Sequence, residues 1–330
     1  MVGKRLCHPG NLYKGIPVMK MSILISTYNG IDDLPLLMES IAGLELGSHE
    51  IEVIIRDDHS TDGTADEVEQ NYPWVTLIRG RRNLGFVRSN NIAFNHAGGD
   101  IICCVNQDTV LETHFLVEAL NIFETRPLVA GINTNMIMPW VLSWNEFRHM
   151  PRGEYPSYEY QLTADGFVRY IAVEPEVRET NFLTGGGFFL RRSILLKDEP
   201  LFDPHIHMYC EDTELSLRLR SRGGVLMYAP GTVIYHCQIP KKTDSFGDFQ
   251  KLLKITWNRF YVLSKHSPPS DFLKNSPLYL LGIIRKMNYL GLRRSKKPLA
   301  YIVGGCTALS FFCLLPYWVC RATARKTQTE

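Results

Sequence analysis

The amino-acid sequence predicts an α/β protein with a mostly parallel sheet covered by helices. Short apolar runs alternate with segments of helical spacing between residues 21 and 105. Each run ends on polar residues, most clearly at Ile101–Val105, which stops at Asn106-Gln107-Asp108. Open α/β sheets bind ligands at the carboxyl ends of their parallel strands. We therefore expect a ligand site at that edge of the sheet.

The individual elements are expected in close succession. Strands are predicted at Met21–Ser26, Glu52–Arg56, Val75–Arg79 and Ile101–Val105, and helices over Leu34–Leu44, over Ala65–Asn71 and in the second half of 83–97. Residues 135–180, with scattered aromatics and prolines, predict an irregular insertion that borders the site. Further on, Gly185-Gly186-Gly187 opens an ordered block, followed by an Arg-rich helix over Leu215–Arg222 and a strand or strand pair near Val225–His236.

The charges are unevenly distributed along the chain. The 330 residues have an ordinary globular composition, with 45% hydrophobic residues and a formal net charge of +2. From Phe272 to Thr329 there are ten Lys or Arg and no acidic residue, which leaves 26 basic against 33 acidic residues in residues 1–271. An acidic body with a basic, apolar tail suggests attachment to an anionic membrane surface, and no nucleic-acid partner is expected.

The segment Leu299–Cys320 has 22 residues without a charge, which is long enough to span a bilayer. Basic residues flank it on both sides, so a single span would place one basic cluster on the unfavourable side. We favour a re-entrant or interfacial hairpin over a true span, with a soluble buried helix pair as the third reading. A dimer surface is a further use for this apolar tail, so a homodimer is left open.

Cysteine spacing and the N-terminus indicate a cytoplasmic protein. The eight cysteines form no CxxC pair, which favours reduced thiols over a zinc site. No apolar core follows the first basic residues, so no signal peptide is expected. We expect peripheral association with the inner face of the membrane. The predicted domains are a disordered lead-in (1–19), a main α/β domain (20–260, with halves at 20–110 and 111–260) and a helical tail (261–330).

Five sequence blocks occur in an order that resembles a known enzyme family. They are Ile25-Ser26-Thr27-Tyr28-Asn29; Asp57–Thr64; Asn83-x-Gly85-Phe86 with Asn90-Asn91; Asn106-x-Asp108-Thr109; and Gly185–Arg192 followed by Glu211-Asp212 and His236. Together they resemble the inverting glycosyltransferases of family 2, which have the GT-A fold. The most similar branch includes bacterial rhamnosyltransferases and galactofuranosyltransferases. The resemblance runs from about residue 21 to residue 240.

The resemblance implies a nucleotide-sugar site at the strand ends. A carboxylate that accepts the N3–H of uracil or thymine grips the base, and the residue in that position here is Asp57. Thr27 and Asn29 are expected to line the same pocket. Asn83 and Asn91 are expected to contact the diphosphate or ribose, and Gly186 to let the backbone approach the sugar. For Asp58 and Asp62 we expect turn and cap roles.

A divalent metal is expected at Asp108. A cation that bridges two phosphates takes hard oxygen ligands and few protein groups. The usual Asp-x-Asp of the family is Asn106-Gln107-Asp108 here, so Asn106 positions ribose or a metal-bound water without adding charge. A lone histidine after a strand is usually structural, but the resemblance makes His236 a metal contact. Mixed carboxylate and imidazole ligation favours Mn²⁺ over Mg²⁺.

The acidic pair Glu211-Asp212 opens a predicted helix. On residue type alone, the pair suits helix capping and pairing with the helix dipole. An inverting transfer also needs one carboxylate to take the proton of the acceptor hydroxyl. The second residue of this pair is the base in the family, so the resemblance assigns Asp212 as base and leaves Glu211 to orient the acceptor.

The expected function is transfer of one sugar to a hydroxyl of a cell-surface glycan or a lipid-linked glycan precursor. dTDP-L-rhamnose is the first choice of donor, and UDP-galactofuranose, UDP-glucose and UDP-GlcNAc are the alternatives. A nucleotidyltransferase on a similar sheet is disfavoured because Thr27-Tyr28-Asn29-Gly30 contains no basic residue. A non-catalytic scaffold of glycan assembly is disfavoured because Asp108, Asp212 and His236 are all present.

Overall fold

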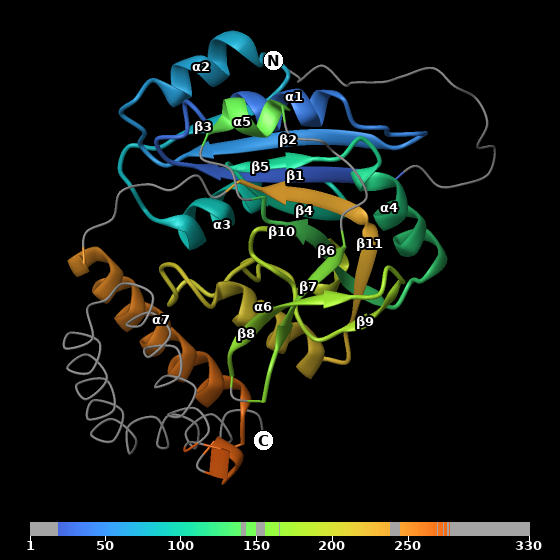
Figure 1. Ribbon diagram of the computed structural model, residues 1–330, viewed down its shortest axis with the longest axis vertical. Helices are drawn as coiled ribbons and strands as arrows, with labels where there is room; N and C mark the ends of the chain where they lie inside the picture. The colour runs from blue at the N-terminus through green and yellow to red at the C-terminus, as the bar shows by residue number, and fades with distance from the viewer. Residues whose placement is uncertain are drawn as a thin grey trace. The chain divides into compact units, whose positions relative to one another are not determined.

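A computed structural model shows how the chain folds (Figure 1). It describes residues 19–139, 143–149, 156–164, 166–237, 245–268, 270–272, 274–275 and 277. By compactness the chain divides into two units, Met1–Gln161 with Tyr170–Pro240, and Leu162–Arg169 with Lys241–Glu330. Every candidate site residue belongs to the first unit. The helix α7 (Ser245–His266) belongs to the second and continues past residue 260, where the main α/β domain was expected to end.

The first unit is built on a mixed sheet. Among the described residues, the strand order is β3-β2-β1-β4-β10-β6-β11-β5, with β9 paired to β11. In Figure 1 the strands β2, β1, β4, β10 and β6 lie side by side in this order. The bounds are β1 Lys20–Thr27, β2 Glu50–Asp57, β3 Thr76–Arg79, β4 Ile101–Asn106, β5 Thr109–Leu111, β6 Val129–Ile137, β9 Arg178–Thr180, β10 Gly187–Arg191 and β11 Val225–His236. Strands β1 to β4 pair in parallel, as do β6 and β11. The strand β10 is antiparallel to both β4 and β6 and joins the two parallel groups.

Helices cover both faces of this sheet. They are α1 (Leu34–Ala42), α2 (Thr64–Asn71), α3 (Phe86–His96), α4 (Phe115–Thr125), α5 (Trp144–His149) and α6 (Glu211–Ser221), with a 3₁₀ turn over Arg192–Ile194. Alternate residues of β1, Met21, Ile23 and Ile25, share one buried cluster with the apolar residues of α1 and α4. The intervening face of β1 and the adjoining face of β2 pack against α3. This two-sided burial explains why the strands are continuous apolar runs.

The structure confirms the predicted fold class and corrects two local expectations. The segment 135–180 is not irregular where it is described, since it contains α5, the hairpin strands β7 (Ser157–Leu162) and β8 (Val168–Val173), and β9. The helix α3 begins at Phe86, earlier than expected. Of the strand or strand pair predicted near Val225–His236, the structure shows a single twelve-residue strand, β11, with two register shifts. The helix α4 and the strand β6, which is buried at all nine positions, had no predicted counterpart.

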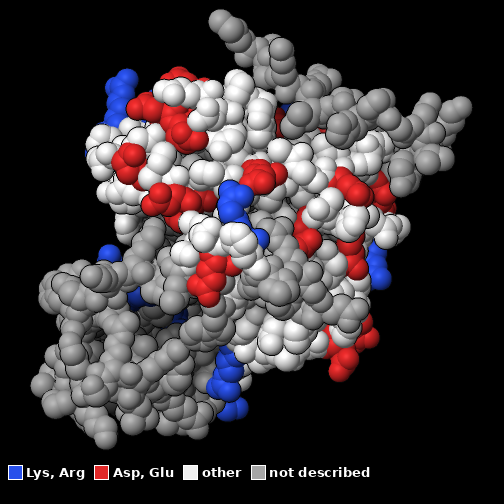
Figure 2. Space-filling model, turned by 45° about the horizontal axis from the view of Figure 1, so that its top comes forward, with Lys and Arg blue, Asp and Glu red and all other residues white. Residues whose placement is uncertain are grey.

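Two expectations concern parts of the chain outside the described residues. The apolar segment 299–320 and residues 1–18 both lie there. Within the described part, no helix has the length and apolar character needed to cross a bilayer. On the face shown in Figure 2, Asp and Glu side chains are spread across the surface while Lys and Arg are sparse. This agrees with the excess of acidic residues counted for residues 1–271.

Candidate functional site

The ends of β1, β2 and β4 form one edge of the sheet, where the donor-binding residues were expected. β1 ends at Thr27, which is paired in register with Asp57 at the end of β2. β4 ends at Asn106, which is paired with Ser26. Neighbouring strands are about 4.8 Å apart. The parallel register therefore brings Thr27, Asp57 and Asn106 to one edge, as expected from the strand ends.

The Asp57 carboxylate is buried, and only one of its oxygens is used. Oδ1 accepts a hydrogen bond from the Ser60 N–H at 3.1 Å, which closes the turn after β2. Oδ2 is buried and has no hydrogen-bond partner within the described residues. Because a buried carboxylate oxygen without a donor is costly, this atom marks a place that suits an N–H group of a ligand.

Asn29 fixes the loop that follows β2. Its Oδ1 accepts a hydrogen bond from the Thr61 N–H at 2.9 Å, and its own N–H donates to Ser60 Oγ at 2.9 Å. Its φ of +49° is a left-handed conformation that asparagine tolerates better than most residues. The side chain thus holds the turn after β2, and its direct contact with a donor stays a prediction.

Gln107, which had no predicted role, joins three segments at this edge. Its Oε1 accepts hydrogen bonds from the Thr27 hydroxyl and the Tyr28 N–H, both at 2.8 Å. Its Nε2 donates to Asp33 Oδ2 at 2.9 Å. The Thr27 hydroxyl is therefore used within the protein. A Cβ on Gly30 would lie 2.6 Å from Thr27 Oγ1, so glycine is needed for this close packing.

The loop before α3 is held by Asp58. This buried carboxylate accepts hydrogen bonds from the Leu84 N–H at 2.9 Å and from the Gly85 N–H at 2.7 Å. Asn83 Oδ1 also accepts from the Gly85 N–H, at 3.1 Å. These bonds join Asp58 to a distant segment, so its role differs from the local turn role that was expected. A ligand contact of Asn83 stays a prediction.

Asn91 is used differently from the expectation. Its Nδ2 donates to the Phe202 carbonyl at 2.9 Å, and its Oδ1 accepts from the Phe202 N–H at 2.8 Å. Both polar groups of the amide therefore fix the backbone of the segment that leads to α6. The structure shows that this side chain braces the protein, and its contact with the diphosphate or ribose stays a prediction.

Asp108 and His236 come together although they are far apart in the sequence. Asp108 lies in the turn between β4 and β5, and β5 pairs with the end of β11, where Thr109 lies opposite His236. His236 Nε2 is 3.1 Å from Asp108 Oδ1. The Asp108 side chain remains 32% exposed and that of His236 11% exposed. An oxygen and a nitrogen ligand are thus presented together at the accessible edge of the sheet.

Gly186 lies between Asn106 and His236. The Asn106 N–H donates to the Gly186 carbonyl at 3.3 Å, while Asn106 Oδ1 is buried without a partner within the described residues. A Cβ on Gly186 would lie 2.5 Å from Met136 Cε and 3.3 Å from His236 Nδ1. Glycine therefore leaves room for these protein side chains, and the expected close approach to a sugar stays a prediction.

Glu211 and Asp212 begin α6 after a strained turn. Tyr209 and Cys210 have φ values of +71° and +70°, which is uncommon for residues with bulky side chains. Such strain is often found at functional sites, where the surrounding structure maintains it. The turn aims Asp212 at the glycine triplet, and the Gly185 N–H donates to Asp212 Oδ2 at 3.2 Å.

The two carboxylates have different surroundings. Burial raises the pKa of both, and the neighbouring Asp212 charge raises the pKa of Glu211 further. Asp212 also accepts a hydrogen bond from the Thr213 N–H at 2.7 Å, whereas Glu211 Oε2 is buried without a partner within the described residues. A proton held by the pair is therefore favoured on Glu211, which leaves Asp212 ionised.

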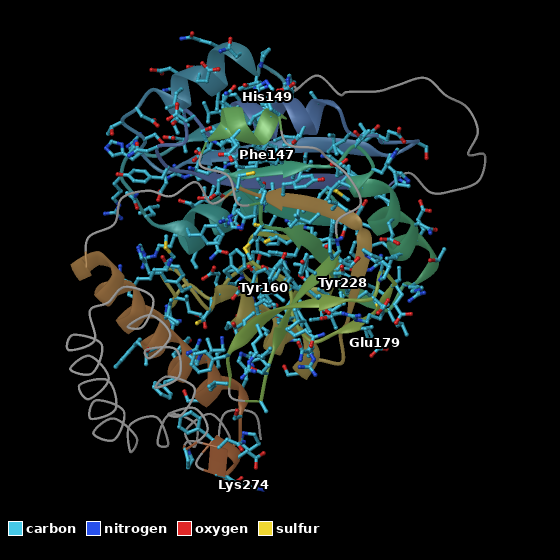
Figure 3. The ribbon with its side chains drawn as sticks, viewed as in Figure 1. Phe147, His149, Tyr160, Glu179, Tyr228 and Lys274 are labelled. Atoms are coloured by element: carbon cyan, nitrogen blue, oxygen red, sulfur yellow. The ribbon has the colours of Figure 1, made fainter. Side chains whose placement is uncertain are left out.

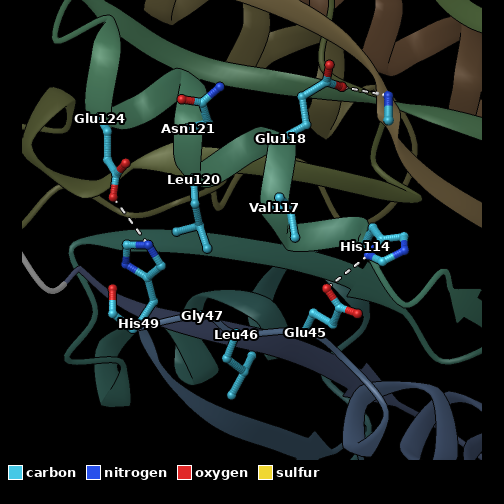
Figure 4. Close-up of a pocket in the computed structure, with 12 residues that line it drawn as sticks. Glu45, Leu46, Gly47, His49, His114, Val117, Glu118, Leu120, Asn121 and Glu124 are labelled. Atoms are coloured by element: carbon cyan, nitrogen blue, oxygen red, sulfur yellow. Dashed lines mark hydrogen bonds and ion pairs between the residues drawn. The ribbon is translucent and has the colours of Figure 1, made fainter. Parts of the chain in front are cut away.

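A groove of about 610 Å³ lies away from this edge. It is lined by the loop before β2 and by α4, and Figure 4 shows His49 paired with Glu124 and His114 paired with Glu45. Because this loop leads into the amino end of β2, the groove lies at the opposite edge of the sheet from Asp57. None of the predicted site residues lines it.

The comparisons with known proteins agree with this arrangement. The family model described as glycosyl transferase family 2 matches residues 22–197. An uncharacterized glycosyltransferase of Haemophilus influenzae is 30% identical over 107 residues, which are 32% of this chain and 35% of that protein. The N-acetylglucosaminyl-diphospho-decaprenol L-rhamnosyltransferase of Mycobacterium tuberculosis is 25% identical over 222 residues, which are 61% of this chain and 72% of that protein. The chain thus spans about a third of the first relative and most of the second.

A solved structure shares the fold. The mannosyltransferase PcManGT of Pyrobaculum calidifontis, in complex with GDP-Man and Mn²⁺, superposes with a TM-score of 0.55 at 15% identity, over 95% of this chain and 88% of that one. At this identity the match concerns the fold alone, which is the GT-A fold that the sequence blocks predicted. Since the family model covers more than half of the chain and includes the ends of β1, β2 and β4, the chain belongs to glycosyl transferase family 2.

Proposed function

We propose that this enzyme is a metal-dependent inverting glycosyltransferase. It transfers a sugar, with L-rhamnose from dTDP-rhamnose as first choice, to a hydroxyl of a lipid-linked glycan precursor or a cell-surface glycan. The observation that carries the proposal is the pair of unpartnered buried oxygens, Asp57 Oδ2 and Asn106 Oδ1, at the ends of the strands that flank β1. These acceptors suit the N–H and O–H groups of a nucleoside.

The donor pocket follows from these two atoms. Asp57 Oδ2 accepts a hydrogen bond from the N3–H of a thymine or uracil ring. A carboxylate oxygen opposite this N–H is the only acceptor that it needs. Asn106 Oδ1 accepts from a ribose hydroxyl. The backbone around both is held by the hydrogen bonds of Gln107 and Asn29, so the acceptors are preorganised before the donor binds.

Asp108 and His236 fit a divalent cation at the neighbouring position. Their ligand atoms are already 3.1 Å apart and belong to the donor types that Mn²⁺ accepts. When bound, the cation stabilises the charge that develops on the departing diphosphate. In its absence, the imidazole and the carboxylate satisfy each other. Two protein ligands are few, which is usual where substrate phosphates supply the remaining oxygens.

Asp212 takes the proton of the acceptor hydroxyl as general base. The hydrogen bonds from Gly185 and Thr213 favour its ionised form, and burial raises its pKa toward the range useful for proton transfer. Glu211 retains its own proton beside it and orients the acceptor. Inversion follows because a single displacement uses one base and leaves no covalent intermediate on the enzyme.

The nature of the substrates is supported by the relatives. The mycobacterial relative is named for transfer of L-rhamnose to a diphospholipid-linked sugar, and the solved archaeal enzyme carries a nucleotide sugar with Mn²⁺. The basic composition of residues 272–329 suits a lipid-linked acceptor at the inner face of the membrane. Under this proposal the protein works in the cytoplasm, peripherally attached to the membrane.

A panel of nucleotide sugars tests the proposal. Thermal stabilisation and donor hydrolysis are measured for the full chain with dTDP-rhamnose, UDP-galactofuranose, UDP-glucose and UDP-GlcNAc, each with Mn²⁺, Mg²⁺ or EDTA. We expect metal-dependent stabilisation by one donor. Asp108→Ala should lose that stabilisation. Asp212→Asn should keep it and lose turnover by about 100-fold or more.

The exposed carboxylate of Glu179 on β9 provides a matched control, since Glu179→Gln removes a charge away from the strand ends. It should behave like the unchanged chain. If a UDP-sugar alone stabilises the chain, the proposed mechanism is retained and that UDP-sugar replaces dTDP-rhamnose as the donor. If no nucleotide sugar stabilises the chain with any metal, the proposed reaction is wrong.

A further inference from the structure

The hairpin strands β7 and β8 present three tyrosines together. The ring centroids of Tyr158 and Tyr170 are 4.7 Å apart and the rings are nearly parallel, while those of Tyr160 and Tyr170 are 4.9 Å apart. All three side chains are half-buried. We call this set the tyrosine cluster. Side chains two apart on a strand share a face, which explains why Tyr158 and Tyr160 both reach Tyr170.

The tyrosine cluster is rigidly anchored. Between two of its members, the buried Glu159 points away and binds Arg178 and Thr180 of β9. The Tyr158 N–H donates to Asn135 Oδ1 at 3.0 Å, which attaches the hairpin to β6. Rings held in this way lose little conformational freedom when a ligand stacks on them.

Hydrogen bonds connect the tyrosine cluster to the candidate site. The Tyr170 hydroxyl donates to the Met136 carbonyl at 2.7 Å, and the Met136 side chain packs against Gly186. The Tyr160 hydroxyl donates to Met138 Sδ at 3.2 Å. Figure 3 labels Tyr160 near the middle of the first unit. One residue, Met136, therefore contacts both Tyr170, through its carbonyl, and Gly186, through its side chain.

Asp212 is linked to the tyrosine cluster through the glycine triplet, because the Gly185 N–H donates to Asp212 Oδ2 and the adjacent Gly186 packs against Met136. Burial raises the pKa of Tyr160, and the Asp212 carboxylate raises it further, so the charge of the candidate base acts on this ring. By contrast, the atoms assigned to the nucleotide lie at the ends of β2 and β4. In the proposed reaction, the acceptor gives up a proton to Asp212. A ligand that contacts the tyrosine cluster and reaches Asp212 is therefore the acceptor.

We propose that the tyrosine cluster is the acceptor subsite and that it stacks against the sugar ring that carries the reacting hydroxyl. This inference rests on the proposed glycosyl transfer. The faces of aromatic rings carry negative charge density, which attracts the weakly positive C–H groups of a pyranose. Because the hydroxyls of Tyr160 and Tyr170 are used in hydrogen bonds within the protein, these rings offer an apolar face and select a saccharide over a bare lipid phosphate.

Kinetics with synthetic acceptors test the subsite. The probes are octyl glycosides of glucose, galactose, GlcNAc and rhamnose, with octyl phosphate as the acceptor that lacks a sugar ring. Tyr160→Leu should raise the acceptor KM by about 3- to 10-fold, as expected for loss of an aromatic contact. Tyr160→Phe retains the ring and should remain close to the unchanged chain. A merely structural role would raise donor and acceptor KM together.

Ile171→Ala provides the control, since this exposed residue follows Tyr170 and points to the other face of β8. Saturation-transfer NMR with the same glycosides, in the absence of donor, measures binding without turnover. Glycoside contacts that weaken in Tyr160→Leu support the subsite even when no donor is turned over, so failure of the proposed reaction is recognised separately. An unchanged acceptor KM and unchanged glycoside contacts in Tyr160→Leu overturn the inference, as does equal binding of octyl phosphate.

Discussion

His236 Nε2 lies 3.1 Å from Asp108 Oδ1, although one residue ends β11 and the other follows β4. The pairing of β5 with β11 produces this contact, since Thr109 lies opposite His236. Neither residue is a metal site alone, and within the described residues no group of three or more His, Cys, Asp or Glu is arranged to hold a metal ion. The site we propose therefore depends on both residues and on the substrate.

The contribution of His236 to metal binding is testable. His236→Ala leaves Asp108 as the single protein ligand, so the Mn²⁺ concentration for half-maximal donor stabilisation should rise by about 10-fold or more. A Mn²⁺ titration in a thermal-shift assay with the donor measures this. His205→Ala, at a histidine whose side chain is 71% exposed, is the control. An unchanged Mn²⁺ requirement would remove His236 from the site.

Gln107 should contribute to stability. Gln107→Ala removes the acceptor of the Thr27 hydroxyl and of the Tyr28 N–H, and it removes one donor from the Asp33 carboxylate, which retains the Trp144 indole N–H. We expect a loss of about 1–3 kcal/mol in the free energy of unfolding. Urea denaturation measures it. Gln107→Glu keeps the acceptor oxygen but places a carboxylate against Asp33. Its loss in the free energy of unfolding should therefore be smaller at acidic pH. A loss that is equal at every pH would contradict this account.

Glu211 should make stability depend on pH. Because burial raises its pKa, the folded chain binds this proton more tightly than the unfolded chain. The resulting stabilisation is present below the unfolded pKa and is lost as the pH rises through the folded pKa. The glutamine of Glu211→Gln cannot ionise. The melting temperature of this variant should therefore rise relative to that of the unchanged chain as the pH rises. Thermal melts from acidic to alkaline pH measure the difference.

The exposed Glu179 is the comparison for this effect. Glu179→Gln should show no such trend, because its carboxylate lies on the surface of β9. If Glu211→Gln and the unchanged chain keep a constant difference in melting temperature from acidic to alkaline pH, the raised pKa of Glu211 is refuted.

Asp58 should order the loop before α3. Asp58→Ala removes the acceptor of the Leu84 and Gly85 N–H groups, and we expect a loss of about 1–3 kcal/mol in the free energy of unfolding. Hydrogen exchange at these two amides should accelerate more than exchange in β1. Asp66→Asn, at an exposed carboxylate, is the control. Equal acceleration throughout the sheet would indicate global destabilisation instead of a local role.

The parallel half of the sheet followed from local sequence. The apolar runs at 21–26, 52–56 and 101–105 are bounded by polar residues, and burial on both faces leaves such runs unmistakable. The position of Asp57 and Asn106 at one edge also followed from the sequence, because the carboxyl ends of neighbouring parallel strands lie at the same edge of a sheet. These features depend on the spacing of neighbouring residues, which any single sequence contains.

The other half of the site depended on contacts between distant segments. β6 is buried throughout but contains the polar residues Asn133, Thr134 and Asn135, so it has neither a continuous apolar run nor an apolar alternation, and its position beside β10 became evident only in the folded chain. Gln107 received its role from Asp33, and Asn91 from the backbone of Phe202.

The tyrosine cluster arises in the same way, where a hairpin in a segment expected to be irregular packs beside Met136. Sequence patterns determined the parallel strands β1 to β4, the order of the motifs and the family. The pairing of strands across the sheet decided which side chains meet, because the partner of a long-range contact leaves no period in the local sequence.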